Sequence, residues 1–76
     1  MPHINIKSYP KGLTETQLQD FANELTALAS KHLNTPAEYI SIDYTAVPED
    51  EWKEKVYDTE IKPNRAHLLK QPQYEM

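Results

Sequence analysis

The chain has 76 residues, a net charge of −4 and no cysteine, so we expect one small domain without disulfides. Basic and acidic residues are interspersed, which argues against nucleic acid or an anionic membrane as the partner. No apolar run reaches membrane-spanning length and no secretion signal opens the chain, so a cytoplasmic protein is expected. A domain of this size buries little apolar surface, and its histidines are too widely spaced for a structural metal, so oligomerisation is the remaining source of stability.

The first predicted element is a strand over residues 3–9, where apolar and polar residues alternate. Ile4 and Ile6 fall on one face and polar residues fall on the other, as in a half-buried strand. The turn that follows contains Gly12, the only glycine, so we expect a positive φ at this position.

A helix is predicted over residues 14–33. Thr14 and Gln17 have the spacing of a capping box, in which each side chain bonds the backbone N–H of the other residue. Apolar residues then recur at steps of three and four, at Leu18, Phe21, Ala22, Leu25, Leu28, Ala29 and Leu33. This spacing predicts one apolar stripe, which ends before Pro36.

A second alternating strand is predicted over residues 39–47. Strand, helix and strand make a βαβ unit, whose strands are parallel and whose crossover is right-handed. Two short helices are predicted after it, at about 49–57 and 59–70. The second is capped by Asp58 or Thr59 and has Pro63 in its first turn, and its inward-facing residues are Ile61, Leu68 and Leu69.

The predicted fold class is therefore α+β, a single domain over residues 1–76 with a parallel βαβ unit, half of a ferredoxin-like fold, and C-terminal helices. A two-stranded sheet leaves both edges open, so we expect a homodimer whose strands join into a four-stranded sheet. The sheet face that carries His3, Lys7 and Asp43 is too polar for the dry centre of a hexamer, and the C-terminal helices can cover it. A dimer is favoured over a hexamer for this reason.

Several motifs together indicate a family. The chain opens with Met-Pro-X-Ile-X-Ile, continues with the capped helix and second strand, and has an aromatic residue just beyond that strand. Further matching segments are PHINIK followed by Tyr-Pro, the helix end His32-Leu33-Asn34 and the closing Lys70-Gln-Pro-Gln-Tyr74. In this combination the chain resembles the 4-oxalocrotonate tautomerase family, and within it the PptA subgroup of enteric bacteria.

The resemblance implies a tautomerase without metal or organic cofactor, which converts an enol of the aryl enolpyruvate or dienol type to its keto form. It implies Pro2 as the general base once Met1 is removed, a removal that a small second residue permits. An α-amino group titrates at about 7.7–8.0 in peptides, and burial lowers that pKa toward the range useful to a base. Ile4 and Trp52 are expected to provide the apolar surroundings.

The resemblance also implies three substrate-binding positions. Trp52 stands where the family has a pocket phenylalanine, and Lys11 matches, within one residue, an arginine just before the helix. Ser41 stands where the family has an arginine on the second strand. A diacid held by two arginines is therefore not the expected substrate, and aryl enolpyruvates, which are associated with the PptA subgroup, are favoured.

Two alternatives remain at this point. The chain could be a non-catalytic dimeric interaction module in which Pro2 is incidental. It could also be a hydratase or dehalogenase on the same fold, although that chemistry needs paired arginines and Ser41 replaces one of them. His3 adjoins Pro2 but alternates to the opposite face, so it is interpreted as a surface or interface residue.

Overall fold

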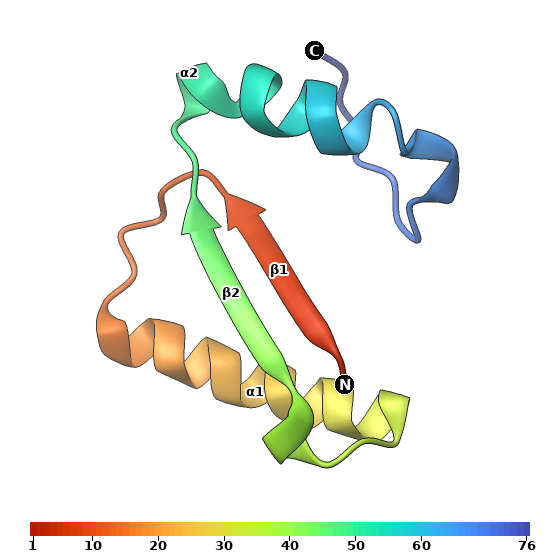
Figure 1. Ribbon diagram of the computed structural model, residues 1–76. Helices are drawn as coiled ribbons and strands as arrows, with labels where there is room; N and C mark the ends of the chain where they lie inside the picture. Colours follow the sequence, from red (N-terminus) through yellow and green to blue (C-terminus); the bar gives the residue numbers. More distant parts are fainter.

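The computed structural model describes all 76 residues, and two parallel strands form its centre (Figure 1). Strand β1 (His3–Ser8) pairs with strand β2 (Ser41–Ala46) along its full length. Helix α1 (Glu15–Leu33) connects them, and a short 3₁₀ turn, η1 (Ala37–Tyr39), leads into β2. The expected α+β class, with a βαβ unit and parallel strands, is confirmed.

Local contacts define the two ends of α1. The hydroxyl of Thr14 accepts from the N–H of Gln17 over 3.1 Å, and Oε1 of Gln17 accepts from the N–H of Thr14 over 3.0 Å, so the predicted capping box is confirmed. Asn34 ends the helix in the left-handed region, at φ 50°, and donates its N–H to Ser30. Gly12 has φ +65°, as predicted for the turn before the helix.

The segment after β2 is one continuous helical run rather than two short helices. Helix α2 (Glu49–Trp52) passes directly into a π-helix, η2 (Lys53–Ile61), and a 3₁₀ turn, η3 (Arg65–His67), follows. A separate helix over residues 59–70 is not formed. Leu69, expected to face inward from that helix, is fully exposed.

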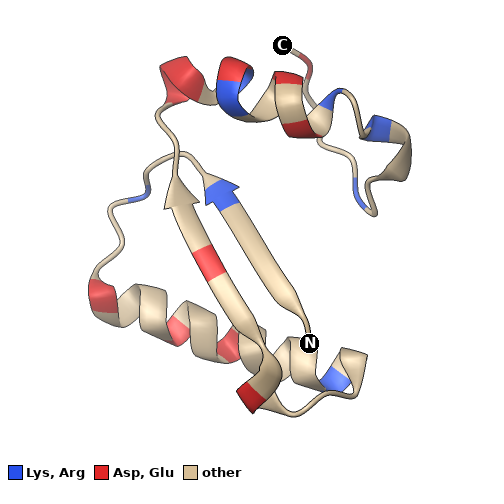
Figure 2. Cartoon of the chain, viewed as in Figure 1, with Lys and Arg blue, Asp and Glu red and all other residues tan.

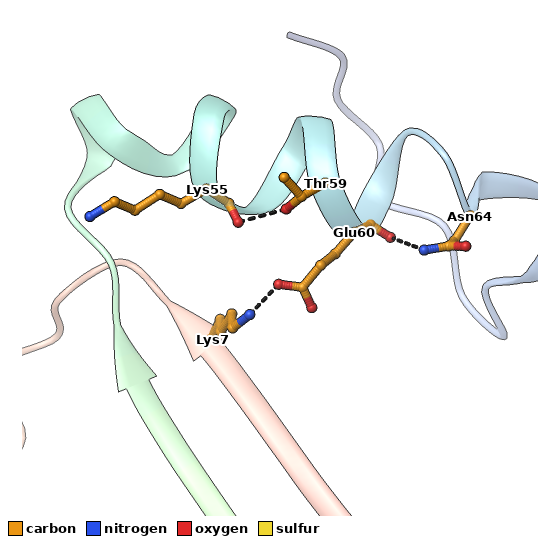
Figure 3. Close-up of polar contacts among 5 residues, drawn as sticks. All are labelled: Lys7, Lys55, Thr59, Glu60 and Asn64. Carbon is orange, nitrogen blue, oxygen red and sulfur yellow. Dashed lines mark hydrogen bonds and ion pairs between the residues drawn. The ribbon is translucent and has the colours of Figure 1, made fainter.

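Side-chain bonds explain why the helix passes through residue 59 and ends near residue 62 (Figure 3). The hydroxyl of Thr59 donates to the carbonyl of Lys55 over 2.7 Å, so Thr59 lies inside a helix instead of capping a new one. Nδ2 of Asn64 donates to the carbonyl of Glu60 over 3.0 Å and satisfies one of the last free carbonyls. Pro63 has no backbone N–H, so it cannot donate the next hydrogen bond of the helix.

The buried core lies at the carboxyl ends of the strands, against the C-terminal helical run. Its members are Val47, Trp52, Val56 and Tyr57, with Tyr9 and Ile61 packed against them. Lys7 on the polar face of β1 forms an ion pair with Glu60 of η2 (Figure 3). The helical run is therefore joined to the sheet by apolar packing and by one charged contact.

Helix α1 lies on the other sheet face and leaves most of its apolar stripe open. Only Ala29 of this helix is buried, while Phe21, Leu28 and Leu33 are 40%, 54% and 55% exposed. A groove of about 440 Å³ remains between α1 and Ile42 of β2. The radius of gyration is 14.1 Å, against about 11.4 Å for a compact chain of this length. One chain therefore does not close its own core around α1.

Candidate active site

Pro2 directly precedes β1 at the amino end of the sheet and is half-buried. Its carbonyl oxygen accepts a hydrogen bond from the N–H of Ser41 over 3.2 Å. The hydroxyl of Ser41 also lies 2.7 Å from Nδ1 of His3. Met1 is 99% exposed and its carbonyl forms the peptide bond to the Pro2 nitrogen, so that nitrogen becomes a base only when Met1 is removed.

A cavity of about 490 Å³ lies at the other end of the sheet, where β1 passes into the loop before α1. Its aromatic walls are Tyr9, Trp52 and Tyr74. The rings of Tyr9 and Trp52 meet edge to face, with centroids 5.2 Å apart and planes at 89°. The remaining lining residues are Lys7, Ser8, Lys11 and Met76. The cavity combines flat aromatic surfaces with two ammonium groups.

The two lysines of this cavity differ in their partners. Lys7 is paired with Glu60, so most of its charge is balanced. Lys11, in the loop before α1, makes no ion pair. Figure 2 shows these basic positions in blue, at the arrowhead of β1 and in the loop that follows it. The charge available to an anionic ligand is therefore that of Lys11.

The four residues selected from the sequence fall into two pairs at opposite ends of the sheet. Pro2 and Ser41 lie where the strands begin, whereas Lys11 and Trp52 lie beyond the points where they end. The six residues of β1 separate the two pairs, a span of about 20 Å at roughly 3.3 Å per residue. Trp52, expected beside Pro2, does not lie there within one chain.

Two aromatic residues of the cavity were not identified as ligand-binding residues from the sequence. Tyr9 ends the alternating stretch of residues 3–9, where an aromatic residue usually packs, so its position alone does not indicate a ligand contact. Tyr74 lies in an irregular tail that has no apolar period, and the only signal it offers is an aromatic ring in a polar segment. The hydroxyl of Tyr74 accepts a hydrogen bond from Nε1 of Trp52 over 2.9 Å.

The rest of the surface carries few features that bear on chemistry. No three His, Asp or Glu side chains are grouped so that they could hold a metal ion. The helices include none with the length and apolar content needed to cross a bilayer. Glu51 accepts a hydrogen bond from Lys55 and raises the pKa of that amine above its usual value, but neither residue lines the cavity.

Comparisons with known proteins identify the class. No family model matches the chain. A tautomerase PptA of Cronobacter sakazakii and one of Klebsiella pneumoniae are each 41% identical over 76 residues, which is 100% of both chains in each comparison. A tautomerase PptA of Escherichia coli is 38% identical over the same full length.

The chain is thus a tautomerase, an isomerase that relocates a proton within a small-molecule substrate. It belongs to the PptA family. The resemblance inferred from the opening motif, the helix end and the closing segment is confirmed. The alternative of a non-catalytic module is set aside by the same relatives.

Proposed function

We propose that the chain converts the enol of an aryl pyruvate to its keto form, with the amine of Pro2 as the general base. The observation that carries the substrate class is the cavity at the carboxyl end of β1. There Tyr9 and Trp52 present aromatic surfaces beside the unpaired ammonium of Lys11. A phenyl ring and a carboxylate joined by a short chain match these two surfaces.

Removal of Met1 makes the Pro2 nitrogen a secondary amine. This amine takes the proton of the enol hydroxyl, and the C–O bond becomes a carbonyl. The protonated nitrogen of Pro2 then gives a proton to the carbon next to the new carbonyl. The electron pair of the C=C bond forms the new C–H bond there. The reaction moves one proton and one double bond, so its atoms and electrons balance without a co-reactant. The base must be neutral, which partial burial favours by lowering the pKa of an α-amino group from about 7.7–8.0.

In this proposal the two halves of the site meet in a homodimer. Antiparallel pairing of β1 with its copy about a twofold axis places the amino end of one strand beside the carboxyl end of the other. Pro2 and Ser41 of one chain then border the cavity that contains Lys11 and Trp52 of the second chain. A four-stranded sheet with two equivalent sites results. The open strand edges and the exposed stripe of α1 support this arrangement.

Each binding residue has a distinct role. The ammonium of Lys11 attracts the substrate carboxylate. The indole of Trp52 packs against the aryl ring and excludes water from the amine. The hydroxyl of Ser41, held by His3 at 2.7 Å, hydrogen-bonds the oxygen atoms of the substrate beside Pro2. Because Ser41 adds no second cation, the site suits a substrate with one carboxylate.

The test compares two N-terminal forms of the protein in the ketonisation of phenylenolpyruvate, followed by the loss of enol absorbance. One form begins at Pro2, and the other keeps one extra residue before it, each verified by intact mass. The extra residue turns the amine into an amide without basicity and leaves every side chain in place. We expect the extended form to fold and to lose roughly 100-fold or more in kcat. Undiminished turnover by the folded, extended form would assign the base to another group.

A further inference from the structure

The C-terminal tail crosses the aromatic core next to the cavity. Nε2 of Gln71 donates to the carbonyl of Arg65 over 3.0 Å, which fixes the beginning of the tail. Three residues later the hydroxyl of Tyr74 accepts the indole N–H of Trp52 over 2.9 Å. The ring of Tyr74 also lies 5.9 Å from that of Tyr57, at 38° between planes. The tail is therefore attached at two points, and the second point is a wall of the cavity.

Burial differs sharply across this contact. Trp52 and Tyr57 are 9% and 3% exposed, whereas Tyr74 is 41% exposed. Tyr57 is itself held in place, because Nη2 of Arg65 donates to its hydroxyl over 2.9 Å. Tyr74 thus lies as an outer cover on two buried aromatic residues, of which Tyr57 is fixed by Arg65 and Trp52 is bonded by Tyr74 itself. A side chain in this position is able to change the cavity while contributing little to the core.

We propose that Tyr74 is a positioning and specificity-determining residue, which orients the indole of Trp52 and limits the size of the aryl group that the cavity accepts. The proposal deepens the proposed function, because the aryl acid is the substrate named there. The indole has one polar atom, a donor, and its hydrogen bond to Tyr74 selects one orientation of the ring. That orientation sets the edge-to-face contact between Trp52 and Tyr9. Removing Tyr74 frees the indole and opens one wall.

Trp52 is the only tryptophan, so its fluorescence reports on this contact without any need for catalysis. The experiment uses the full chain with Tyr74→Phe, which removes the hydroxyl alone, and with Tyr74→Ala, which removes the ring. Gln73→Ala is the matched control, because Gln73 is an exposed neighbour that does not line the cavity. The probe is 3-phenylpropanoate, an unreactive aryl acid. Far-ultraviolet circular dichroism verifies that each variant is folded.

We expect Tyr74→Ala to shift the tryptophan emission to longer wavelength, because water reaches the indole. Its affinity for 3-phenylpropanoate should fall roughly tenfold, with a fall of about threefold in Tyr74→Phe, the size of one lost hydrogen bond. Gln73→Ala should match the wild type. Wild-type emission that does not respond to the probe, or equal emission and affinity in Tyr74→Ala and the wild type, would overturn the proposal.

Kinetics separate specificity from a general structural defect. Tyr74→Ala should raise KM for phenylenolpyruvate by about the same factor as the loss of affinity, with kcat within about twofold of the wild type. The enol of pyruvate, which has no ring, should show no such rise in KM. Equal effects on both substrates would overturn the specificity role. The fluorescence titration measures binding and does not involve the Pro2 amine. Its result therefore tests the role of Tyr74 even if Pro2 proves not to be the base.

Discussion

Ser41 donates its main-chain N–H to the carbonyl oxygen of Pro2 over 3.2 Å, which holds the two residues side by side where the strands begin. Because this contact uses only backbone atoms, it persists whatever side chain stands at position 41. In the proposed site, the side chain at this position, whose hydroxyl also lies 2.7 Å from Nδ1 of His3, is available to bind substrate next to the base. Substitutions there should change specificity without displacing Pro2.

Ser41→Ala removes the hydroxyl and should lower kcat/KM for phenylenolpyruvate by roughly three- to tenfold, the effect of one hydrogen bond. Ser41→Arg adds a second cation and should shift preference toward the enol of a dicarboxylic acid by about tenfold or more. Steady-state kinetics on a monoacid and a diacid enol measure both effects. Thr45→Ala, at the opposite end of the same strand, is the control. If the ratio of kcat/KM for the diacid to kcat/KM for the monoacid is the same in Ser41→Arg as in the wild type, position 41 has no binding role.

Pro2→Ala leaves a primary amine at nearly the same place. We expect a much lower rate with the fold retained, because a flexible primary amine is a less well positioned base. For the mature wild type, activity should rise with pH as the amine loses its proton and should level off above its pKa, at or below about 7.7–8.0. This rise is measured as the ascending limb of a plot of kcat/KM against pH. A wild-type profile without an ascending limb in this range is incompatible with an amine base.

Lys11→Ala should raise KM for an aryl enolpyruvate roughly tenfold and leave kcat nearly unchanged, since the carboxylate is bound equally before and during proton transfer. Lys11→Arg should retain most of the affinity, because it keeps the charge. Lys31→Ala, an exposed lysine in the last turn of α1, serves as the control. The difference between Lys11→Ala and the wild type should shrink at high salt. Equal KM values in Lys11→Ala and Lys31→Ala would show that Lys11 does not bind substrate.

Mixing two inactive variants tests whether one site draws on two chains. One variant carries an extra residue before Pro2, and the other carries Trp52→Ala. After subunit exchange, half of the dimers are mixed, and each mixed dimer has one intact site, so about a quarter of the wild-type activity should return. A site contained within one chain predicts no recovery. The measurement is the ketonisation rate before and after exchange, with dimer formation verified by light scattering.

Much of the fold could be predicted from the sequence because its signals are local. The alternation around Ile4 and Ile6 indicates β1, and the pairing of Thr14 with Gln17 marks the beginning of α1. The structure of the C-terminal third was harder to predict from the sequence. Thr59 has the residue type of a helix cap, yet its hydroxyl bonds Lys55 within a continuing helix, and a single local residue does not distinguish these two roles.

The site residues came from the resemblance, but their arrangement came from the structure. Parallel strands place Pro2 and Trp52 at opposite ends of the sheet, and the direction of the strands is a property of the whole βαβ unit. Tyr74 could not be found from periodicity, because its tail is irregular. Its role depends on a contact with Trp52, 22 positions earlier in the chain.

The open stripe of α1 has a consequence for the behaviour of the protein on dilution. In the proposed dimer, the second copy covers part of the apolar surface that Phe21, Leu28 and Leu33 expose in a single chain, so folding and association are linked by mass action. The midpoint of thermal unfolding should then rise with protein concentration. Activity per chain should fall when the protein is diluted below the dissociation constant of the dimer. If the site is shared between two chains as proposed, the protein concentration sets the fraction of chains whose Pro2 amine lies beside a cavity.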